Sequence, residues 1–476
     1  MTRGRAACAA GAFSLAACAT HPPPVATPAA ASDTGVWSYD VGVSPDAHVL
    51  DVTGTFPPGA GDTIEADPTQ GAFVDALVVR DGASWRPLAK GAGADTWAAP
   101  CARGCVVHYR FRLDDAARAS GDVDDAATMH DAIEAPPSTW LLRPAVGGAT
   151  YRFHVTTQGT ARFATGVPPV PGAPDTYGAR AEDLASAPYS VFGKMRLRDL
   201  PRRNGDATIV VAMLDGKLVM TDADIDHWID LSARAVESYY GRFPVRRLLL
   251  LVAPSTWGRE QVEGRTLAGG GSTILLGVSP EMKPEDIPRD WVLTHEMTHL
   301  AMPTLPRDDH WLEEGSATYV EPIARAQVGT IPAKDVWKGL VEGLPNGQPE
   351  AGDQGLDATH TWGRTYWGGA LFCFLADVEI RERSNGRASL ETALRGILAF
   401  GSGERRASLE DVLQAGDAAT GTTVLAELHA RQGGKSETTD LPTLWKKLGV
   451  KDERGEVSFD DAAPLAGLRK AMTQSQ

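Results

Sequence analysis

The chain has 476 residues, of which 43% are hydrophobic and 22% charged, and its formal net charge is -15. This length exceeds what one hydrophobic core usually organises, so we expect more than one domain. The acidic balance supplies no basic stripe of the kind that nucleic acids require, and no uninterrupted apolar run reaches the roughly eighteen residues that a membrane-spanning helix needs.

The N-terminus has the layout of a secretory signal, because arginines precede a small apolar run over residues 6–17. The sequence Leu-Ala-Ala-Cys that ends at Cys18 resembles a bacterial lipobox, in which the peptide is cut before the cysteine and the cysteine is lipidated. The resemblance implies a signal peptide over residues 1–17 and an exported protein anchored to the cell envelope by acyl chains. Ala19 follows where an aspartate would favour the inner membrane, so we expect the outer membrane, facing the periplasm or the cell surface. An ordinary signal peptide with an incidental cysteine is the alternative.

Two cysteines of the exported part, Cys101 and Cys105, lie close together in the sequence. An oxidising export compartment permits a disulfide between them. A metal site is the alternative, but no second cysteine pair or nearby histidine pair completes a set of four ligands. We therefore expect a small loop closed by a disulfide.

The first half of the chain reads as a linker followed by strands. Residues 18–35 are rich in proline, alanine and threonine without an apolar period, which predicts a flexible linker. Over residues 36–165, segments of alternating apolar and polar residues are separated by Gly, Pro and Asp turns, which predicts an antiparallel β-sandwich-like domain. A second proline-rich stretch, residues 166–174, is typical of a link between domains.

The pattern changes after residue 175, where long apolar strands and helices of 3.6-residue period appear. We expect strands at residues 209–214, 248–252 and 272–278. We expect helices at residues 224–241, 361–383, 389–398, 408–414 and 424–431. The predicted fold class is therefore multidomain α+β, with an α+β domain over residues 175–335 and a helical C-terminal region over residues 336–476.

A metal-binding pattern stands in the middle of the second domain, where His295, Glu296 and His299 follow one another. On a helix the two histidines lie one turn apart on one face, so both imidazoles can reach the same metal ion. Glu296 points elsewhere around the helix and can contact a water molecule at the metal instead. A catalytic zinc site needs three protein ligands and an open fourth position, so a third ligand is expected nearby.

The helix expected after Pro306 can supply that ligand, because Glu314 lies in its first turns. Glu321 follows on the same face and could hydrogen-bond the outer nitrogen of a zinc-bound histidine. The alternative is that these glutamates form a solvated helix face. His310 could compete as a ligand, but we expect it at the rim of the site or behind a ligand.

These residues resemble the gluzincin peptidases, a group that includes aminopeptidase N and the glycyl aminopeptidases. The shared pattern is His-Glu-x-x-His followed by Trp-Leu-x-Glu-Gly, and residues 311–315 read Trp-Leu-Glu-Glu-Gly. The resemblance implies a thermolysin-like zincin catalytic domain with one zinc ion, Glu314 as the third ligand and Glu296 as the catalytic base. It implies zinc-dependent hydrolysis of peptide bonds in a peptide or protein substrate.

Two further segments are similar to elements of these families. Tyr366 begins the sequence Tyr-Trp-Gly-Gly-Ala, which looks like the element whose tyrosine donates to the oxyanion of the tetrahedral intermediate; a buried structural tyrosine is the alternative. Gly270, Gly271 and Ser272 occupy the place of the strand that lines the cleft, which implies contact with the substrate backbone. A glycine-rich loop without a special role is the alternative there. The glutamate that grips the free amine in aminopeptidases is missing, so amino- and endopeptidase activity both stay open.

Two other functions also stay open. A gluzincin can hydrolyse a non-peptide substrate, and a non-catalytic envelope lipoprotein can retain a zinc fold. The second alternative predicts a damaged ligand set, whereas all four metal-site positions are intact in this sequence. Nothing in the sequence indicates the oligomeric state.

Overall fold

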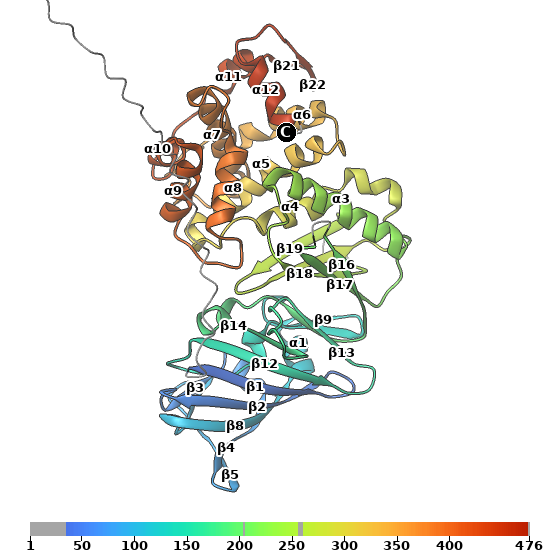
Figure 1. Ribbon diagram of the computed structural model, residues 1–476, viewed down its shortest axis with the longest axis vertical. Helices are drawn as coiled ribbons and strands as arrows, with labels where there is room; N and C mark the ends of the chain where they lie inside the picture. Colours follow the sequence, from blue (N-terminus) through green and yellow to red (C-terminus); the bar gives the residue numbers. More distant parts are fainter. Residues whose placement is uncertain (1–34, 203–204, 256–259, 475–476) are drawn as a thin grey trace, which may run out of the picture. The chain divides into compact units, whose positions relative to one another are not determined.

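The computed structural model describes residues 35–202, 205–255 and 260–474. The expected signal peptide, the lipidation site Cys18 and all but the last residue of the expected linker lie outside the described residues. No helix in the described ranges combines the length and the apolar character that a membrane span requires. The described part is a mixed α+β structure that begins with a domain of β-sheets and continues into a further sheet covered by helices (Figure 1).

The N-terminal β domain is built around a seven-stranded sheet of order β14-β12-β1-β2-β8-β4-β5. Its inward positions carry the apolar residues of the alternating pattern, such as Leu50, Val52 and Phe56 on one face of β2. The strands are β1 Val36–Val43, β2 Val49–Pro58, β4 Val74–Asp81, β5 Ser84–Pro87, β8 Arg103–Arg112, β12 Thr150–Thr157 and β14 Thr176–Arg180. Cys101 and Cys105 form the expected disulfide next to the start of β8.

Two smaller four-stranded sheets complete the β domain, with orders β13-β15-β10-β9 and β11-β3-β7-β6. Their strands are β3 Thr63–Glu65, β6 Ala89–Lys90, β7 Thr96–Ala98, β9 Ala127–Met129, β10 Ala132–Glu134, β11 Arg143–Pro144, β13 Arg162–Thr165 and β15 Ser190–Gly193. Two short helices, α1 Leu113–Ser120 and α2 Pro137–Trp140, lie between them in the sequence.

The β domain differs from the prediction in two respects. The pair β1–β12 is parallel, so the large sheet is mixed rather than purely antiparallel. The stretch 166–174 does not lead out of the domain, because β14 and β15 follow it and pair with β12, β10 and β13. The proline-rich stretch is a connection inside the domain: Val167 is fully buried, and the amide of Val170 donates to the carbonyl of Thr176. The β domain therefore extends to Gly193 rather than ending at residue 165.

The second domain contains a five-stranded sheet of order β16-β17-β18-β20-β19. The central strands β17, β18 and β20 are parallel, and the edge strands β16 and β19 are antiparallel to their neighbours. Strands buried on both faces read as continuous apolar runs, which is why the predicted strands coincide closely with β17, β18 and β20. The strands are β16 Met195–Pro201, β17 Thr208–Leu214, β18 Arg247–Ala253, β19 Val262–Ala268 and β20 Ser272–Val278.

Helices cover this sheet and form most of the C-terminal region (Figure 1). One continuous hydrophobic core joins the sheet to the helices as far as Met472, so the C-terminal region packs on the second domain. The helices are α3 Asp222–Tyr240, α4 Val292–His299, α5 His310–Gln327, α6 Ala333–Gly343, α7 Gly369–Arg383, α8 Leu390–Phe400, α9 Leu409–Thr420, α10 Val424–Gln432, α11 Leu441–Leu448 and α12 Ala466–Thr473. The hairpin of β21 Val450–Glu453 and β22 Glu456–Phe459 interrupts the region predicted as helical.

Candidate metal centre

Helix α4 presents the two histidines of the metal pattern. Asp290 caps its start, because the carboxylate accepts from the amides of Val292 and Leu293 at 3.2 and 3.3 Å. The same carboxylate accepts from the indole of Trp228 on α3 at 2.9 Å, which ties the helix start to the core. His295 is therefore held in a buried helix, with only 5% of its surface exposed.

Helix α5 presents Glu314, which is 8% exposed. Its neighbour Gly315 lies against the start of α7, where a Cβ added to Gly315 would come within 2.2 Å of the backbone of Gly369. A Cβ on Gly369 would in turn lie 2.0 Å from the carbonyl oxygen of Trp311. Only glycine allows the two helices to approach this closely. Gly315 and Gly369 therefore bring Glu314 close to the segment that carries Tyr366.

The donor atoms of His295, His299 and Glu314 converge on one point. The Nε2 atoms of the histidines are 3.2 Å apart, and Oε2 of Glu314 lies 3.3 Å from the first and 3.5 Å from the second. Zinc bound tetrahedrally with bonds of 2.0–2.1 Å places its ligand atoms about 3.3 Å apart. The triangle therefore fits a zinc ion, and these three residues are the group in the described ranges whose ligand atoms lie close enough to hold a metal.

The electrostatics of this triangle also favour a cation. Burial acts to raise the pKa of Glu314, but His299, His295 and His310 outweigh it and hold that pKa well below its usual range. Burial acts to lower the pKa of His299, yet Glu314, together with the more distant Glu296 and Glu313, raises this pKa to about 9. Without a metal, a proton would thus be shared between His299 and Glu314, and a metal ion would displace this proton on binding.

Glu296 lies beside the first histidine and is oriented by the edge strand β19. The hydroxyl of Thr266 lies 2.6 Å from Oε2 of Glu296 and 3.0 Å from its carbonyl oxygen. Gly264, two residues earlier on the same face, leaves room for Glu296, since an added Cβ would lie 2.5 Å from its Cγ. Gly264 and Thr266 are not predicted from the sequence, because β19 lacks the apolar alternation that marks a strand.

Tyr366 lies in a π-helical segment, Gly363–Gly368, directly before α7. Such segments are rare and frequently occur at functional sites. The ring stacks on that of His295 with a centroid distance of 6.4 Å and an interplanar angle of 18°. Burial raises the pKa of Tyr366, and Glu314 and Glu296 add to the rise. The hydroxyl therefore keeps its proton and can act as a hydrogen-bond donor.

A cleft of about 780 Å³ lies over these residues. From the second domain it is lined by residues 264–268 of β19, by α4 and α5, and by Tyr366. From the β domain it is lined by Asp124, Pro136, Ser138 and residues 185–187. This volume is within the range typical of ligand sites. The expected metal ligands, Glu296 and Tyr366 thus share one cleft.

Gly270, Gly271 and Ser272 do not line the cleft. The two glycines form the turn between β19 and β20, and Ser272 begins β20, whose two edges are already paired with β18 and β19. A substrate cannot add to a strand that has no free edge. The expectation of substrate binding at residues 270–272 is therefore corrected: among the described strands of this sheet, β19 is the edge that borders the cleft.

The role expected for Glu321 also differs from the structure. Its carboxylate accepts from Nη1 of Arg325 at 2.6 Å, and Arg325 donates to the carbonyl of Pro288 at 2.6 Å. Burial raises the pKa of Glu321 to about 7, against the lowering effect of Arg325. Glu321 thus fastens α5 to the segment before α4 rather than to a metal-binding histidine. His310, by contrast, contacts Glu314 directly, with Nε2 3.1 Å from Oε1.

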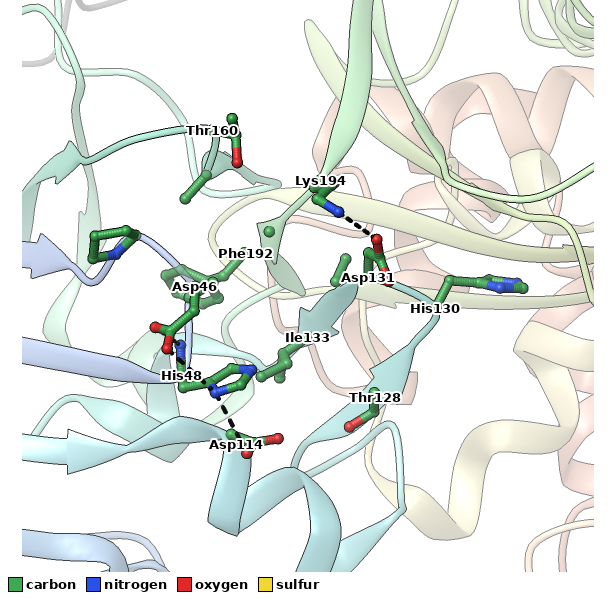
Figure 2. Close-up of a pocket in the computed structure, with 15 residues that line it drawn as sticks. Asp46, His48, Asp114, Thr128, His130, Asp131, Ile133, Thr160, Phe192 and Lys194 are labelled. Atoms are coloured by element: carbon green, nitrogen blue, oxygen red, sulfur yellow. Dashed lines mark hydrogen bonds and ion pairs between the residues drawn. The ribbon is translucent and has the colours of Figure 1, made fainter.

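A second hollow, of about 280 Å³, lies in the β domain and is shown in Figure 2. The carboxylates labelled there have cationic or imidazole neighbours: Nδ1 of His48 lies 3.5 Å from Asp46 and 3.7 Å from Asp114, and Lys194 pairs with Asp131 at 2.6 Å. Among the described residues, the side chains of this hollow do not form a group whose ligand atoms lie close enough together to hold a metal ion.

The sequence matches no protein-family model and no curated protein. Solved structures share its fold. An aminopeptidase N family protein from Idiomarina loihiensis matches with a TM-score of 0.66 and 15% identity over 87% of this chain and 78% of that one. An M1 zinc metallopeptidase from Deinococcus radiodurans matches with a TM-score of 0.54 and 15% identity over 86% of this chain and 94% of that one. A variant of that enzyme bound to a Tyr-Ser-Ala substrate matches with a TM-score of 0.54 and 14% identity over 86% and 95%. At these identities the likeness shows the fold alone, which is that of M1 zinc metallopeptidases.

Proposed function

We propose that this protein is a zinc-dependent peptidase whose metal is held by His295, His299 and Glu314. The observation that carries the proposal is the triangle of ligand atoms with sides of 3.2, 3.3 and 3.5 Å, which has the size of a zinc site and opens into a cleft. The shared fold supports it, since the neighbouring structures are of zinc metallopeptidases and one of them contains a peptide substrate.

A zinc ion held there would supply Lewis acidity, which lowers the pKa of water and polarises a carbonyl group. Glu296 is placed to accept the proton of the attacking water and to return it to the leaving amine. Thr266 holds that carboxylate by a hydrogen bond of 2.6 Å, so its orientation is fixed before the substrate enters. The hydroxyl of Tyr366 is placed to donate to the oxyanion of the tetrahedral intermediate. The free edge of β19 can align an extended peptide by main-chain hydrogen bonds.

Replacement of Tyr366 by phenylalanine should lower kcat by about 10²- to 10³-fold, the usual effect of removing one oxyanion donor. We expect KM to change much less, because the hydroxyl contributes mainly in the transition state. Steady-state kinetics on a fluorogenic peptide measure both. Tyr177→Phe, in β14 of the β domain, is the matched control and should retain full activity. An unchanged kcat in Tyr366→Phe would assign this tyrosine a purely structural role.

The acidic side chains of the cleft bear on whether a substrate's free amino terminus has a binding site there. Each of the four acidic side chains that line the cleft already has a partner in the described structure: Asp124 pairs with Arg265, Glu296 with Thr266, Glu313 with His310 and Glu314 with the histidines. A carboxylate that is free to accept a charge-assisted hydrogen bond is the strongest partner for an ammonium group. The cleft therefore offers no dedicated site for a free amine among the described residues.

We accordingly expect N-acetylated and free peptides of the same sequence to be hydrolysed with kcat/KM values within about one order of magnitude of each other, which is a difference of at most about 1.4 kcal/mol in activation free energy. Mass-spectrometric analysis of the products over time measures both rates and locates the cleaved bonds. A strict requirement for a free N-terminus would contradict this expectation and would make the protein an aminopeptidase.

We also propose that the protein is exported and anchored to the cell envelope through Cys18, on the basis of the signal-like start and the Leu-Ala-Ala-Cys sequence. The full-length protein should partition into detergent with the membrane fraction, and Cys18→Ser should move it to the aqueous phase. Equal partitioning of the two proteins would exclude the lipid anchor. The proposed peptidase activity of the part that follows Cys18 does not depend on the result of this experiment.

A further inference from the structure

His310, the first residue of α5, lies between two glutamates of its own helix. Its Nδ1 atom is 2.7 Å from Oε2 of Glu313, and its Nε2 atom is 3.1 Å from Oε1 of Glu314. Both ring nitrogens therefore face carboxylate oxygens, and carboxylates accept hydrogen bonds but do not donate them. His310 thus bridges Glu313 and Glu314, and a proton on Nε2 lets it donate to Oε1 of Glu314.

The two oxygens of Glu314 have different surroundings. Oε2 faces the histidines of α4, at 3.3 Å from His295 and 3.5 Å from His299, whereas Oε1 faces His310. A carboxylate with one oxygen held in this way presents the other oxygen alone to a metal. The side chain is also prevented from rotating, because both of its oxygens have fixed neighbours.

Glu313 holds His310 from the other side. Oε1 of Glu313 accepts from the backbone amide of Leu305 at 3.1 Å, and Leu305 is 7% exposed in the connection between α4 and α5. The chain of contacts therefore runs from the buried backbone of Leu305 through Glu313 and His310 to the metal-facing carboxylate. Groups behind metal ligands orient them in this manner, and their loss typically lowers metal affinity by about 10- to 100-fold.

We propose that His310 is a positioning residue that holds Glu314 as a one-oxygen zinc ligand, with Glu313 as its support. The inference rests on the zinc site of the proposed function. It assigns a role to the variable residue of the Trp-Leu-x-Glu-Gly pattern, here Glu313, which otherwise has none in the reaction. By holding Oε1, His310 would leave positions at a bound zinc ion open for water and for the substrate carbonyl.

The test compares His310→Ala and His310→Gln with His360→Ala as the matched control. His360 has the same side-chain exposure as His310, 50%, and also faces a carboxylate, that of Asp308 at 3.8 Å. The zinc dissociation constant is measured by chelator competition on each purified full-length protein. The visible absorption of the cobalt-substituted proteins reports the coordination number, and kcat and KM are measured separately.

We expect His310→Ala to raise the zinc dissociation constant about 10- to 100-fold and to change the cobalt bands, because the second oxygen of Glu314 becomes free to bind. His310→Gln should recover most of the affinity, since its amide can donate to Oε1. His360→Ala should equal the wild type in both measurements. Circular dichroism confirms that each variant is folded.

Two results would overturn the inference. One is a zinc affinity and a cobalt spectrum of His310→Ala equal to those of His360→Ala. The other is a His310→Gln protein no better than His310→Ala, which would remove the donor role. A wild-type protein that binds no zinc would instead overturn the proposed function itself, so the two failures are distinguishable.

Discussion

Glu296→Gln should lower kcat by about 10²- to 10⁴-fold, the contribution typical of a positioned general base. Glutamine has the same shape and can keep the contact with Thr266, but it cannot accept the proton of the attacking water. Because Glu296 is outside the ligand triangle, we expect the variant and the wild type to bind the same amount of zinc. Peptide hydrolysis and metal content are measured on the same preparation.

Glu342→Gln, an exposed position on α6, is the matched control and should leave kcat unchanged. Hydrolysis by Glu296→Gln at the wild-type rate, with equal zinc content, would exclude the proposed mechanism. Loss of zinc together with activity would instead show that Glu296 belongs to the ligand set.

His299→Ala should abolish activity by removing the metal. Only two ligands remain in this variant, so its zinc affinity should fall by more than the roughly 10- to 100-fold that loss of an outer partner causes. Bound zinc also stabilises the folded protein, by about 2.7 kcal/mol when free zinc is 100 times its dissociation constant. We therefore expect added zinc to raise the melting temperature of the wild type but not that of His299→Ala.

Differential scanning calorimetry of the two apoproteins, with and without added zinc, checks this expectation. His227→Ala, at an exposed position on α3, should respond to zinc as the wild type does. An equal rise in melting temperature for His299→Ala would contradict the assignment of His299 as a ligand.

The parts of the centre that could be predicted from sequence depend on local spacing. His295 and His299 share a face because any helix places residues four apart together, and Glu314 lies in a helix with strong sequence signals. The distance between Glu314 and the two histidines could not be predicted from sequence, because it depends on how the two helices pack. Thr266 and Gly264 could not be found in this way, because the contact between β19 and α4 joins residues that no short pattern relates.

In the fold, too, the elements that depend on local sequence could be predicted, whereas the pairings between distant segments could not. Strands buried on both faces have unmistakable apolar runs, and β17, β18 and β20 were predicted near their true bounds. The parallel pairing of β1 with β12 depends on which strands meet, and this is set by the whole domain. Proline in residues 166–174 signals that the chain turns, but composition does not tell whether it then leaves the domain or returns, as it does here through β14 and β15.

The close contact of Gly315 with Gly369 has a consequence for the energetics of catalysis. Main-chain atoms, which have no rotamers, set the separation of the helices that carry Glu314 and Tyr366. Glu314 and Tyr366, the proposed third metal ligand and the proposed oxyanion donor, are therefore preorganised: little conformational entropy would be lost in bringing them together when a substrate binds. Preorganised dipoles contribute more to rate than groups that must reorient during the reaction. A cavity-forming substitution elsewhere in α7 should thus lower the stability of the protein while leaving the separation of Glu314 and Tyr366 unchanged.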